Sequence, residues 1–403
     1  MKQNRKEKGN VPNLRFPEFT GEWKMKKLGE IAEKINSGKT PLGGEAVYTR
    51  EGVLFIRSQN VNNDKLDLDN PVYIPESINN QMKNSIVKSD DILLNITGAS
   101  LGRSCVVPKD FKVGNVNQHV CIIRLNIQYS PRFVQPIFSS NKGQLIFNSL
   151  QTGSGREGLN FESIKGIKLS IPQKDEQIKI ATFLSLIDQR IETQNKIIKK
   201  LESLIRGIYS ATKQESWIMY YLRDVLEQRD EQNIHEYPVF SVAVREGIIN
   251  QIEHLGRSFA AKDTRNYNVV QFGDIVYTKS PTGSFPYGIV KQSFINHPVA
   301  VSPLYGVYKP KNHHLGNILH HYFLSPINAN NYLHSLIQKG AKNTINITSQ
   351  RFLDKAILLP VNEIEIKNIS LLLEVISRKI HLEKDALIKA ETQKKYLSQQ
   401  MFI

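Results

Sequence analysis

Two long segments of the chain carry apolar residues at the same repeating spacing. The first segment runs from Asp175 to Lys213 and contains no proline and a single glycine. Its apolar positions follow one another at alternating steps of four and three residues, which is the spacing of a coiled-coil seam on one face of an α-helix. One seam position is polar. The seam consists of Ile187, Ile191, Gln194, Ile198, Leu201, Ile205 and Ile208.

The second segment, from Ile364 to Ile403, repeats this seam. It lacks glycine and proline, and Ile376 lies 189 residues after Ile187. The same offset leads from the polar residue Gln194 to Glu383. Two helices that match in length and register predict an antiparallel or parallel pair, in which each helix follows one globular half of the chain. The second seam consists of Ile376, Ile380, Glu383, Leu387, Ala390, Lys394 and Leu397.

Three landmarks precede each long helix. They are a Trp-x4-Leu-x-acid opening, a strand that begins with an acidic residue, and a short apolar strand that a proline ends. The chain is therefore one unit used twice. The landmarks lie at Trp23–Glu30, Ser89–Gly98 and Lys168–Pro172 in the first half, and at Trp217–Asp224, Phe272–Ser280 and Ala356–Pro360 in the second.

Short β-branched and aromatic runs fill the space between the landmarks. Gly, Pro, Asn and Asp interrupt these runs, which is typical of strands. Helical patterns are fewer, and the best are Ser130–Leu150 and Leu315–Gln338. The sequence therefore predicts α+β domains. The predicted order is an N-terminal arm (1–22), a first globular domain (23–174), a central helix (175–213), a second globular domain (214–361) and a distal helix (362–403).

The chain is basic throughout. Its 403 residues include 53 Lys and Arg against 38 Asp and Glu, which gives a formal net charge of +15. This excess favours a polyanion partner, DNA or RNA, over a membrane surface. No apolar run reaches the roughly 18 residues of a membrane span, and the first ten residues lack the apolar stretch of a secretion signal. We expect a cytoplasmic protein, with Cys105 and Cys121 as buried thiols.

No motif for catalysis is complete. Ser37–Pro41 resembles the end of a phosphate loop, but Glu33 stands where that loop requires its first glycine. Asp69–Tyr73 resembles the tetrapeptide of adenine methyltransferases, but Val72 replaces the second proline. The histidines between 313 and 321 are expected on the surface around a helix start. We expect no catalytic residue, metal or cofactor in this chain.

Polar side chains that suit base contact gather at the ends of predicted strands. Asn, Gln and Arg match the edges of adenine and guanine, and a strand end lets them reach outward from a fixed backbone. Taken singly, each Asn or Thr is equally suited to satisfying a turn, so the set carries the prediction. The candidates in the first half are Arg57, Ser58, Gln59, Asn60, Asn95, Thr97, Arg103, Asn117, Gln118, His119 and Arg156, and those in the second half are Thr278, Lys279, Ser280, Lys291, Lys342, Asn343 and Asn346.

With these features the chain resembles the specificity subunit of type I restriction-modification systems. The resemblance covers nearly all of the chain and rests on the repeated landmarks and on the helix start EQIKIATFLSLIDQRI, which recurs as IEIKNISLLLEVISRKI. It implies two target-recognition domains that each read one half of a split DNA site, and an N-terminal arm that lies near the distal helix. It also implies paired helices that set the spacer and dock two methyltransferase subunits, with restriction subunits outside them. S-adenosylmethionine, ATP and Mg²⁺ are expected in those partner subunits, which methylate adenine and cut DNA.

The second helix departs from the first at two points. Ser377 replaces Asp188, and the acid-Gln pair is replaced by Ile364-Glu365. A less standard methyltransferase contact is expected there. A helix of 39 residues is roughly 58 Å long, which equals roughly 17 base pairs and suits a ruler between two half-sites. We also expect four residues to read bases in one half-site only, namely Gln59, Asn95, Asn117 and Gln118.

Two other classes of protein fit less well. An enzyme that fuses a methyltransferase or nuclease to specificity domains would need a cofactor loop or a nuclease core. An adaptor that joins two protein-binding domains through a coiled coil would need neither the positive charge nor the Asn, Gln and Arg clusters. A steep salt dependence of DNA binding would separate the DNA-binding class from the adaptor.

Overall fold

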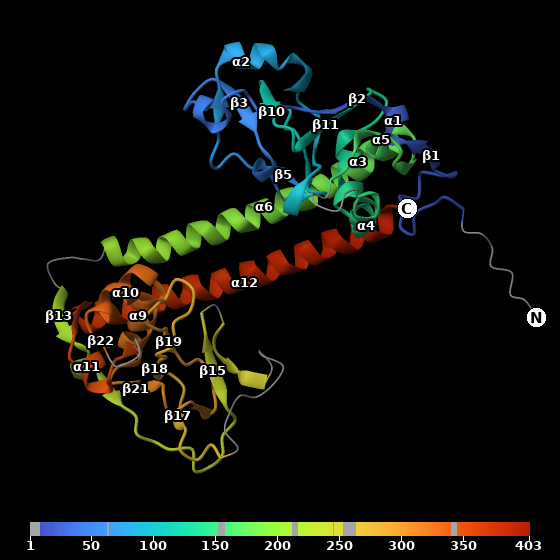
Figure 1. The fold of residues 1–403 in the computed structure, drawn as a ribbon. Helices are drawn as coiled ribbons and strands as arrows, with labels where there is room; N and C mark the ends of the chain where they lie inside the picture. Colours follow the sequence, from blue (N-terminus) through green and yellow to red (C-terminus); the bar gives the residue numbers. More distant parts are fainter. Residues whose placement is uncertain are drawn as a thin grey trace, which may run out of the picture. The chain divides into compact units, whose positions relative to one another are not determined.

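The computed structural model describes residues 9–62, 64–151, 158–211, 217–244, 246–252, 263–339 and 345–403 (Figure 1). The chain divides into two compact units. Unit 1 comprises Met1–Thr193 and Ala386–Ile403, and unit 2 comprises Gln194–Asp385. Both divisions fall inside the long helices α6 (Lys174–Ala211) and α12 (Glu363–Met401), so each unit contains part of both helices.

Unit 1 is an α+β domain with two four-stranded sheets. The first sheet has the order β2-β11-β8-β9, the second has the order β6-β3-β10-β7, and β1 pairs with β12. The strands are β1 (Lys24–Lys27), β2 (Ala32–Ser37), β3 (Val53–Ile56), β4 (Val61–Asn62), β5 (Lys65–Leu66), β6 (Tyr73–Ile74), β7 (Ile86–Val87), β8 (Ile92–Asn95), β9 (Ser104–Val106), β10 (Gly114–Val116), β11 (Val120–Leu125) and β12 (Lys168–Ile171). The shorter helices are α1 (Leu28–Ile31), α2 (Glu76–Gln81), α3 (Pro131–Ser139), α4 (Asn141–Leu150) and α5 (Phe161–Lys165).

The central strands β8 and β11 separate two apolar cores. Ile92 and Leu94 belong to one core, and Leu93 between them belongs to the other. Side chains alternate across a strand, so a strand that is covered on both faces reads as one continuous apolar run. The cysteines Cys105 and Cys121 also lie on opposite sides, and burial raises the pKa of both thiols to about 12. The expectation of buried thiols is confirmed.

Unit 2 repeats this frame. Its four-stranded sheet has the order β14-β21-β18-β19, and β13 pairs with β24. The strands are β13 (Trp217–Tyr221), β14 (Leu226–Gln228), β15 (Phe240–Ala243), β16 (Gly247–Asn250), β17 (Asn268–Val270), β18 (Ile275–Tyr277), β19 (Val290–Gln292), β20 (Val299–Val301), β21 (Gly306–Pro310), β22 (Gln338–Lys339), β23 (Ile345–Asn346) and β24 (Ala356–Pro360). The shorter helices are α7 (Leu222–Val225), α9 (His313–Leu324), α10 (Pro326–His334) and α11 (Ser349–Leu353).

Each opening tryptophan is tied to the start of a long helix. The indole N–H of Trp23 donates to Oε1 of Glu176 at 3.2 Å, and that of Trp217 donates to Oε1 of Glu365 at 2.8 Å. Glu365 is therefore the counterpart of Glu176. The predicted replacement of the acid-Gln pair by Ile364-Glu365 is one residue out of register, because the acidic residue is kept and Gln177 is the residue that changes, to Ile366.

The two long helices run antiparallel. In unit 1, Nζ of Lys394 lies 2.7 Å from Oδ1 of Asp188. In unit 2, Nζ of Lys384 lies 3.4 Å from Oε1 of Glu202. As residue numbers rise along α6, the numbers of the α12 residues that they contact fall. Of the two predicted arrangements, the antiparallel one is therefore correct. All predicted seam positions are buried or half-buried along both helices, including Ile208, Ala390 and Lys394.

The polar seam residue Lys394 has two acidic partners in unit 1. Its ammonium lies 3.2 Å from Oδ2 of Asp64 in addition to the contact with Asp188. Burial lowers the pKa of Lys394, but the two carboxylates outweigh this effect and leave it raised. The ion pairs thus compensate for a charge at an apolar position.

The N-terminal arm packs against both long helices within unit 1. Arg15 forms a two-point ion pair with Glu176 in α6, at 2.7 Å for each bond. The backbone N–H of Leu14 donates to the carbonyl of Gln400 in the last turn of α12 at 2.9 Å. The arm therefore lies near the distal helix, as the resemblance implied.

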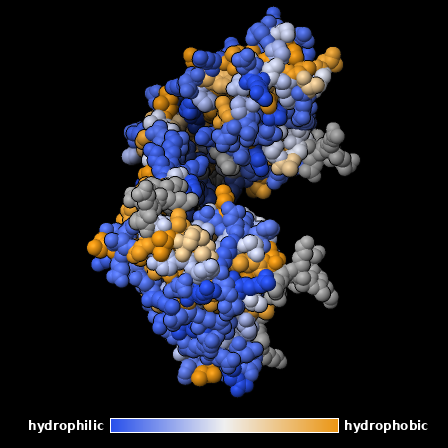
Figure 2. Space-filling model, turned by 90° about the vertical axis from the view of Figure 1, so that its left-hand side faces the viewer, coloured by the Kyte–Doolittle hydropathy of each residue, from blue (hydrophilic) through white to orange (hydrophobic). Residues whose placement is uncertain are grey.

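Hydrophilic residues cover most of the face shown in Figure 2, with apolar residues scattered among them. Within the described residues, none of the helices combines the length and the apolar character that crossing a membrane requires.

The expectation of surface histidines is wrong for His321, which is 5% exposed. Its Nε2 lies 3.3 Å from Oγ of Ser377.

Candidate nucleic-acid interface

Polar residues from separate strand ends meet in unit 1. Asn95 ends β8, and its Nδ2 donates to the carbonyl of Ser58, which follows β3, at 2.8 Å. The backbone N–H of Ile96 donates to the carbonyl of His119, which follows β10, at 3.0 Å. We call the group around these contacts the strand-end cluster. It consists of Thr40, Ser58, Asn95, Thr97, Gln118 and His119.

Three of the predicted DNA-contacting residues are buried and hold the backbone instead. Asn60 is 4% exposed, and its Oδ1 accepts from the N–H of Arg57 at 2.9 Å. Asn117 is 9% exposed, and its Oδ1 accepts from the N–H of His119 at 3.1 Å. Asn95 is fully buried. Such contacts fix turns, which corrects the prediction that these three asparagines face DNA.

The remaining candidates of the first half lie at the surface or close to it. Gln59, Arg103 and Gln118 are exposed, whereas Arg57, Ser58, Thr97 and His119 are half-buried. The guanidinium of Arg57 lies over the ring of Tyr48, with 5.8 Å between its Cζ and the ring centroid. Arg103 donates to Oδ1 of Asn62 at 3.3 Å. Arg156 lies outside the described residues.

A hydrogen-bonded chain of four side chains crosses the strand-end cluster. The hydroxyl of Thr40 donates to Oε1 of Gln118. Nε2 of Gln118 lies 3.0 Å from Nε2 of His119, and Nδ1 of His119 lies 2.6 Å from Oγ1 of Thr97. The chain holds the exposed amide of Gln118 in one orientation.

Sequence reasoning missed Thr40 as a member of the site. The turn that carries it passes the backbone of β10 so closely that a Cβ on Gly38 would lie 1.6 Å from the carbonyl oxygen of Val116. Only glycine fits there. The segment Ser37–Pro41 resembles an incomplete phosphate loop, but its Gly-x-Thr order is the signal for a tight turn that ends in a hydroxyl.

The second half presents fewer of its candidates. Thr278 is 2% exposed, and its Oγ1 accepts from the N–H of Ile289 at 3.2 Å. Lys291 is 3% exposed, and burial lowers the pKa of its ammonium to about 8. Both are corrections, because buried groups do not reach a duplex. Lys279 is half-buried and Ser280 is exposed. Lys342 and Asn343 lie outside the described residues, and Asn346 is described only as part of β23.

An arginine and an aspartate brace the sheet β2-β11-β8-β9 of unit 1 and the sheet β14-β21-β18-β19 of unit 2. Arg124 donates two hydrogen bonds of 2.7 Å to Asp91, and Arg229 donates bonds of 2.6 and 3.0 Å to Asp274. The hydrogen bonds raise the pKa of both guanidinium groups. The acidic residue that opens each predicted strand therefore holds the sheet together and is not available as a catalytic base.

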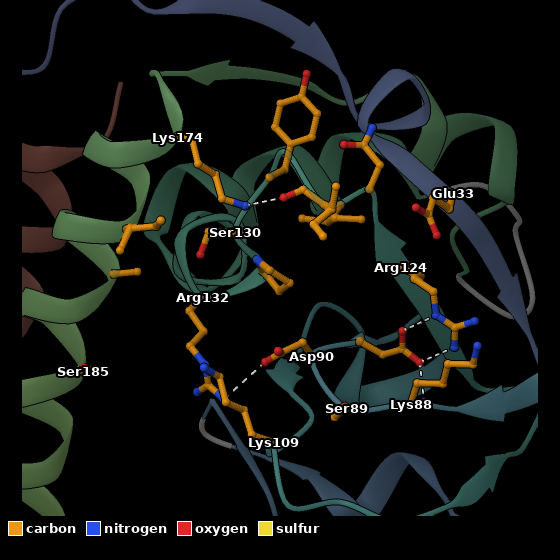
Figure 3. A pocket seen from close by; sticks show the side chains of 18 of the residues that line it. Glu33, Lys88, Ser89, Asp90, Lys109, Arg124, Ser130, Arg132, Lys174 and Ser185 are labelled. Carbon is orange, nitrogen blue, oxygen red and sulfur yellow. Dashed lines mark hydrogen bonds and ion pairs between the residues drawn. The ribbon is translucent and has the colours of Figure 1, made fainter.

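A cavity of about 580 Å³ lies elsewhere in unit 1 (Figure 3). It lies between the start of α6 and the turn before β8, and no residue of the strand-end cluster lines it. Two of its arginines are paired with aspartates: Arg124 binds Asp91, and Arg132 lies 3.5 Å from Asp90. None of the predicted DNA-contacting residues lines the cavity, so it is not the candidate site.

Part of the chain matches a known protein family. Residues 20–203 match the family model described as the type I restriction modification DNA specificity domain. The type I restriction enzyme EcoBI specificity subunit from Escherichia coli is 26% identical over 167 residues, which are 41% of this chain and 34% of that protein. The HindI specificity subunit from Haemophilus influenzae is 25% identical over 198 residues, which are 47% and 40%. The matches thus span less than half the length of these relatives.

The fold is shared over almost the whole chain. The crystal structure of the type I restriction-modification system S subunit from M. genitalium matches with a TM-score of 0.64 and 12% identity, over 98% of this chain and 99% of that one. At 12% identity this likeness shows a shared fold, and residues 20–203 match the type I restriction modification DNA specificity domain family.

Proposed function

We propose that this chain is the DNA-recognition subunit of a type I restriction-modification complex. Each unit reads one half of a bipartite site, and the paired helices set the number of unread base pairs between the halves. The chain itself carries no catalytic step. Two methyltransferase subunits dock on the helices, restriction subunits join outside them, and these partners bring S-adenosylmethionine, ATP and Mg²⁺. Because its target is genomic DNA, the complex acts in the cytoplasm.

One observation carries this proposal: the two units share one strand order, but the residues at the ends of their strands differ. The sheet β2-β11-β8-β9 of unit 1 ends beside the exposed Gln118, whereas the sheet of the same order in unit 2, β14-β21-β18-β19, ends beside the half-buried Lys279 and the exposed Ser280. A common frame with different polar groups at one end suits two domains that read different sequences. The net charge of +15 supplies the attraction to phosphates that any such reader needs.

The proposal predicts a bipartite methylation motif. Genome-wide mapping of methylated adenines, in cells that carry this chain with its partner subunits, should give two different half-sites separated by a fixed number of unread base pairs. Binding of the assembled complex to that site should fall by about a thousandfold or more between 50 and 200 mM salt.

Two controls separate the competing classes. The purified chain alone, incubated with S-adenosylmethionine and DNA, should methylate nothing, whereas methylation would make it an enzyme. If the chain were an adaptor of protein domains, the complex would show neither a specific DNA site nor a steep salt dependence of DNA binding. A single uninterrupted motif would contradict the assignment of one half-site to each unit.

A further inference from the structure

We propose that Gln118 reads an adenine in the half-site bound by unit 1, and that Thr40 and His119 are positioning residues that fix the direction of its amide. The inference rests on the proposed function and deepens it, because it names one base and the residues that select it. Thr40 had no assigned role in recognition.

The backbone holds Gln118 at the tip of a tight turn. The side chain of Asn117 closes the turn through the N–H of His119, and the N–H of Val120 donates to the carbonyl of Asn117 at 3.3 Å. From the neighbouring segment, the N–H of Gly38 donates to the same carbonyl at 3.2 Å. Gln118 is exposed, whereas Asn117 beside it is buried. Gln118 is thus the amide of this turn that faces outward.

In the structure the amide nitrogen of Gln118 lies next to His119, and its oxygen lies next to the hydroxyl of Thr40. With the imidazole proton of His119 on Nδ1, where Thr97 accepts it, Nε2 of His119 is an acceptor. The amide nitrogen of Gln118 therefore faces His119, and its oxygen faces the hydroxyl of Thr40. Reversal of the amide would require His119 to donate from Nε2 and Thr40 to accept. The observed chain is self-consistent from end to end.

The groups that remain free on Gln118 match one base. A primary amide has two N–H donors and an oxygen with two lone pairs, and the chain uses one of each. One donor and one acceptor remain, side by side and in fixed order. The major-groove edge of adenine offers an acceptor at N7 and a donor at N6, whereas guanine offers two acceptors. A fixed amide therefore favours adenine and rejects guanine at that position.

The test compares four variants of the full-length chain, assembled with its partner subunits, on duplexes in which each base of the first half-site is varied in turn. Gln118→Ala should lower the preference for adenine at one position by about 5-fold to 150-fold. Thr40→Val removes the donor with little change in shape and should lower the same preference by at least threefold. Thr40→Ser keeps the hydroxyl and should restore it. The matched control is Thr20→Val, an exposed threonine in the arm, which should change nothing.

Each outcome decides a separate point. The second half-site should keep its sequence in every variant, and the midpoint of thermal unfolding should be unchanged for Thr40→Val, so that misfolding does not imitate the effect. Equal preferences for Thr40→Val and Thr40→Ser would overturn the positioning role of Thr40. An unchanged adenine preference in Gln118→Ala would overturn the inference as a whole. A wild-type complex that selects no DNA sequence would overturn the proposed function.

Discussion

A single buried ammonium shows how the position of a charge decides what it does. Lys291 lies on β19 and is 3% exposed, and its pKa is lowered to about 8 by burial. Burial of His321 itself lowers the pKa of its imidazole to about 4, with the charge of Lys291 as a second cause. The sequence predicts this lysine as a DNA-contacting residue, but its buried charge lowers the stability of the fold.

Lys291→Met should stabilise the protein at pH 7. The ordinary pKa of lysine is 10.5, so between about pH 8 and 10.5 the unfolded state binds more protons than the folded state, and the stability of the wild type rises with pH through this window. Methionine removes a penalty of up to about 3 kcal/mol at pH 7. Urea unfolding of the variant and the wild type at pH 7 and pH 10 measures this difference in the free energy of unfolding.

The gain from Lys291→Met should shrink at pH 10, where the wild-type lysine is neutral in the folded state. Lys309→Met, on an exposed position of β21, is the matched control and should have little effect at either pH. A loss of stability at pH 7, or the same gain at both pH values, would show that the ammonium of Lys291 has a partner that keeps it charged.

The sequence located the strand-end residues but did not give their direction. Asn95 turns inward because its partner is the carbonyl of Ser58, 37 residues away. Asn60 likewise donates to the carbonyl of Asp67 across a turn. Whether an asparagine caps a turn or faces solvent depends on such distant backbone groups, which a local pattern does not contain. Gln118 remains exposed because its neighbour Asn117 already closes the turn.

At the scale of elements, substitutions at two glycines test the packing, because one position has no room for a Cβ and the other has open space around it. Gly38→Ala places a Cβ 1.6 Å from the carbonyl oxygen of Val116, so β10 or the turn must move, at a cost of about 3 kcal/mol or more. Gly207 lies in α6 with nothing within 4 Å of a Cβ, so Gly207→Ala should stabilise by about 0.5–1 kcal/mol. Denaturant midpoints of the two variants measure both effects.

The signs of the two glycine effects carry the test. Gly38→Ala should also abolish base preference in the first half-site and leave the second intact, because it displaces the turn that carries Thr40. If Gly38→Ala were neutral, or Gly207→Ala destabilising, the close approach at β10 or the helical state of α6 near Gly207 would be wrong.

The long helices were the most predictable elements. Their seam repeats every three to four residues over many turns, so periodicity alone gives their existence and their buried face. Their direction depends on which charges meet, such as Asp188 with Lys394, and spacing does not fix this. Glu365 lies at the same offset of 189 residues from Glu176 as the seam positions, and the opening tryptophans that bind the two acids confirm this register.

At the scale of the molecule, the compact units differ from the predicted domains. We predicted boundaries at the starts of the long helices, but the units divide the helices near their middles. The reason is packing: Leu184 and Ile187 of α6 and Leu397 and Met401 of α12 all belong to the main core of unit 1. The helices are therefore structural parts of the units, and a change in helix length leaves each core complete if it falls at the middle.

The central claim, that the helix pair sets the spacing of two half-sites, has one direct test. Deletion of residues 194–200 from α6 together with 385–391 from α12 removes one heptad from each helix and keeps both seams in register. Seven residues correspond to about 10 Å, or about three base pairs. Methylation mapping should show both half-site sequences unchanged and the unread spacer shorter by about three base pairs. An unchanged spacer, or altered half-site sequences, would contradict the account.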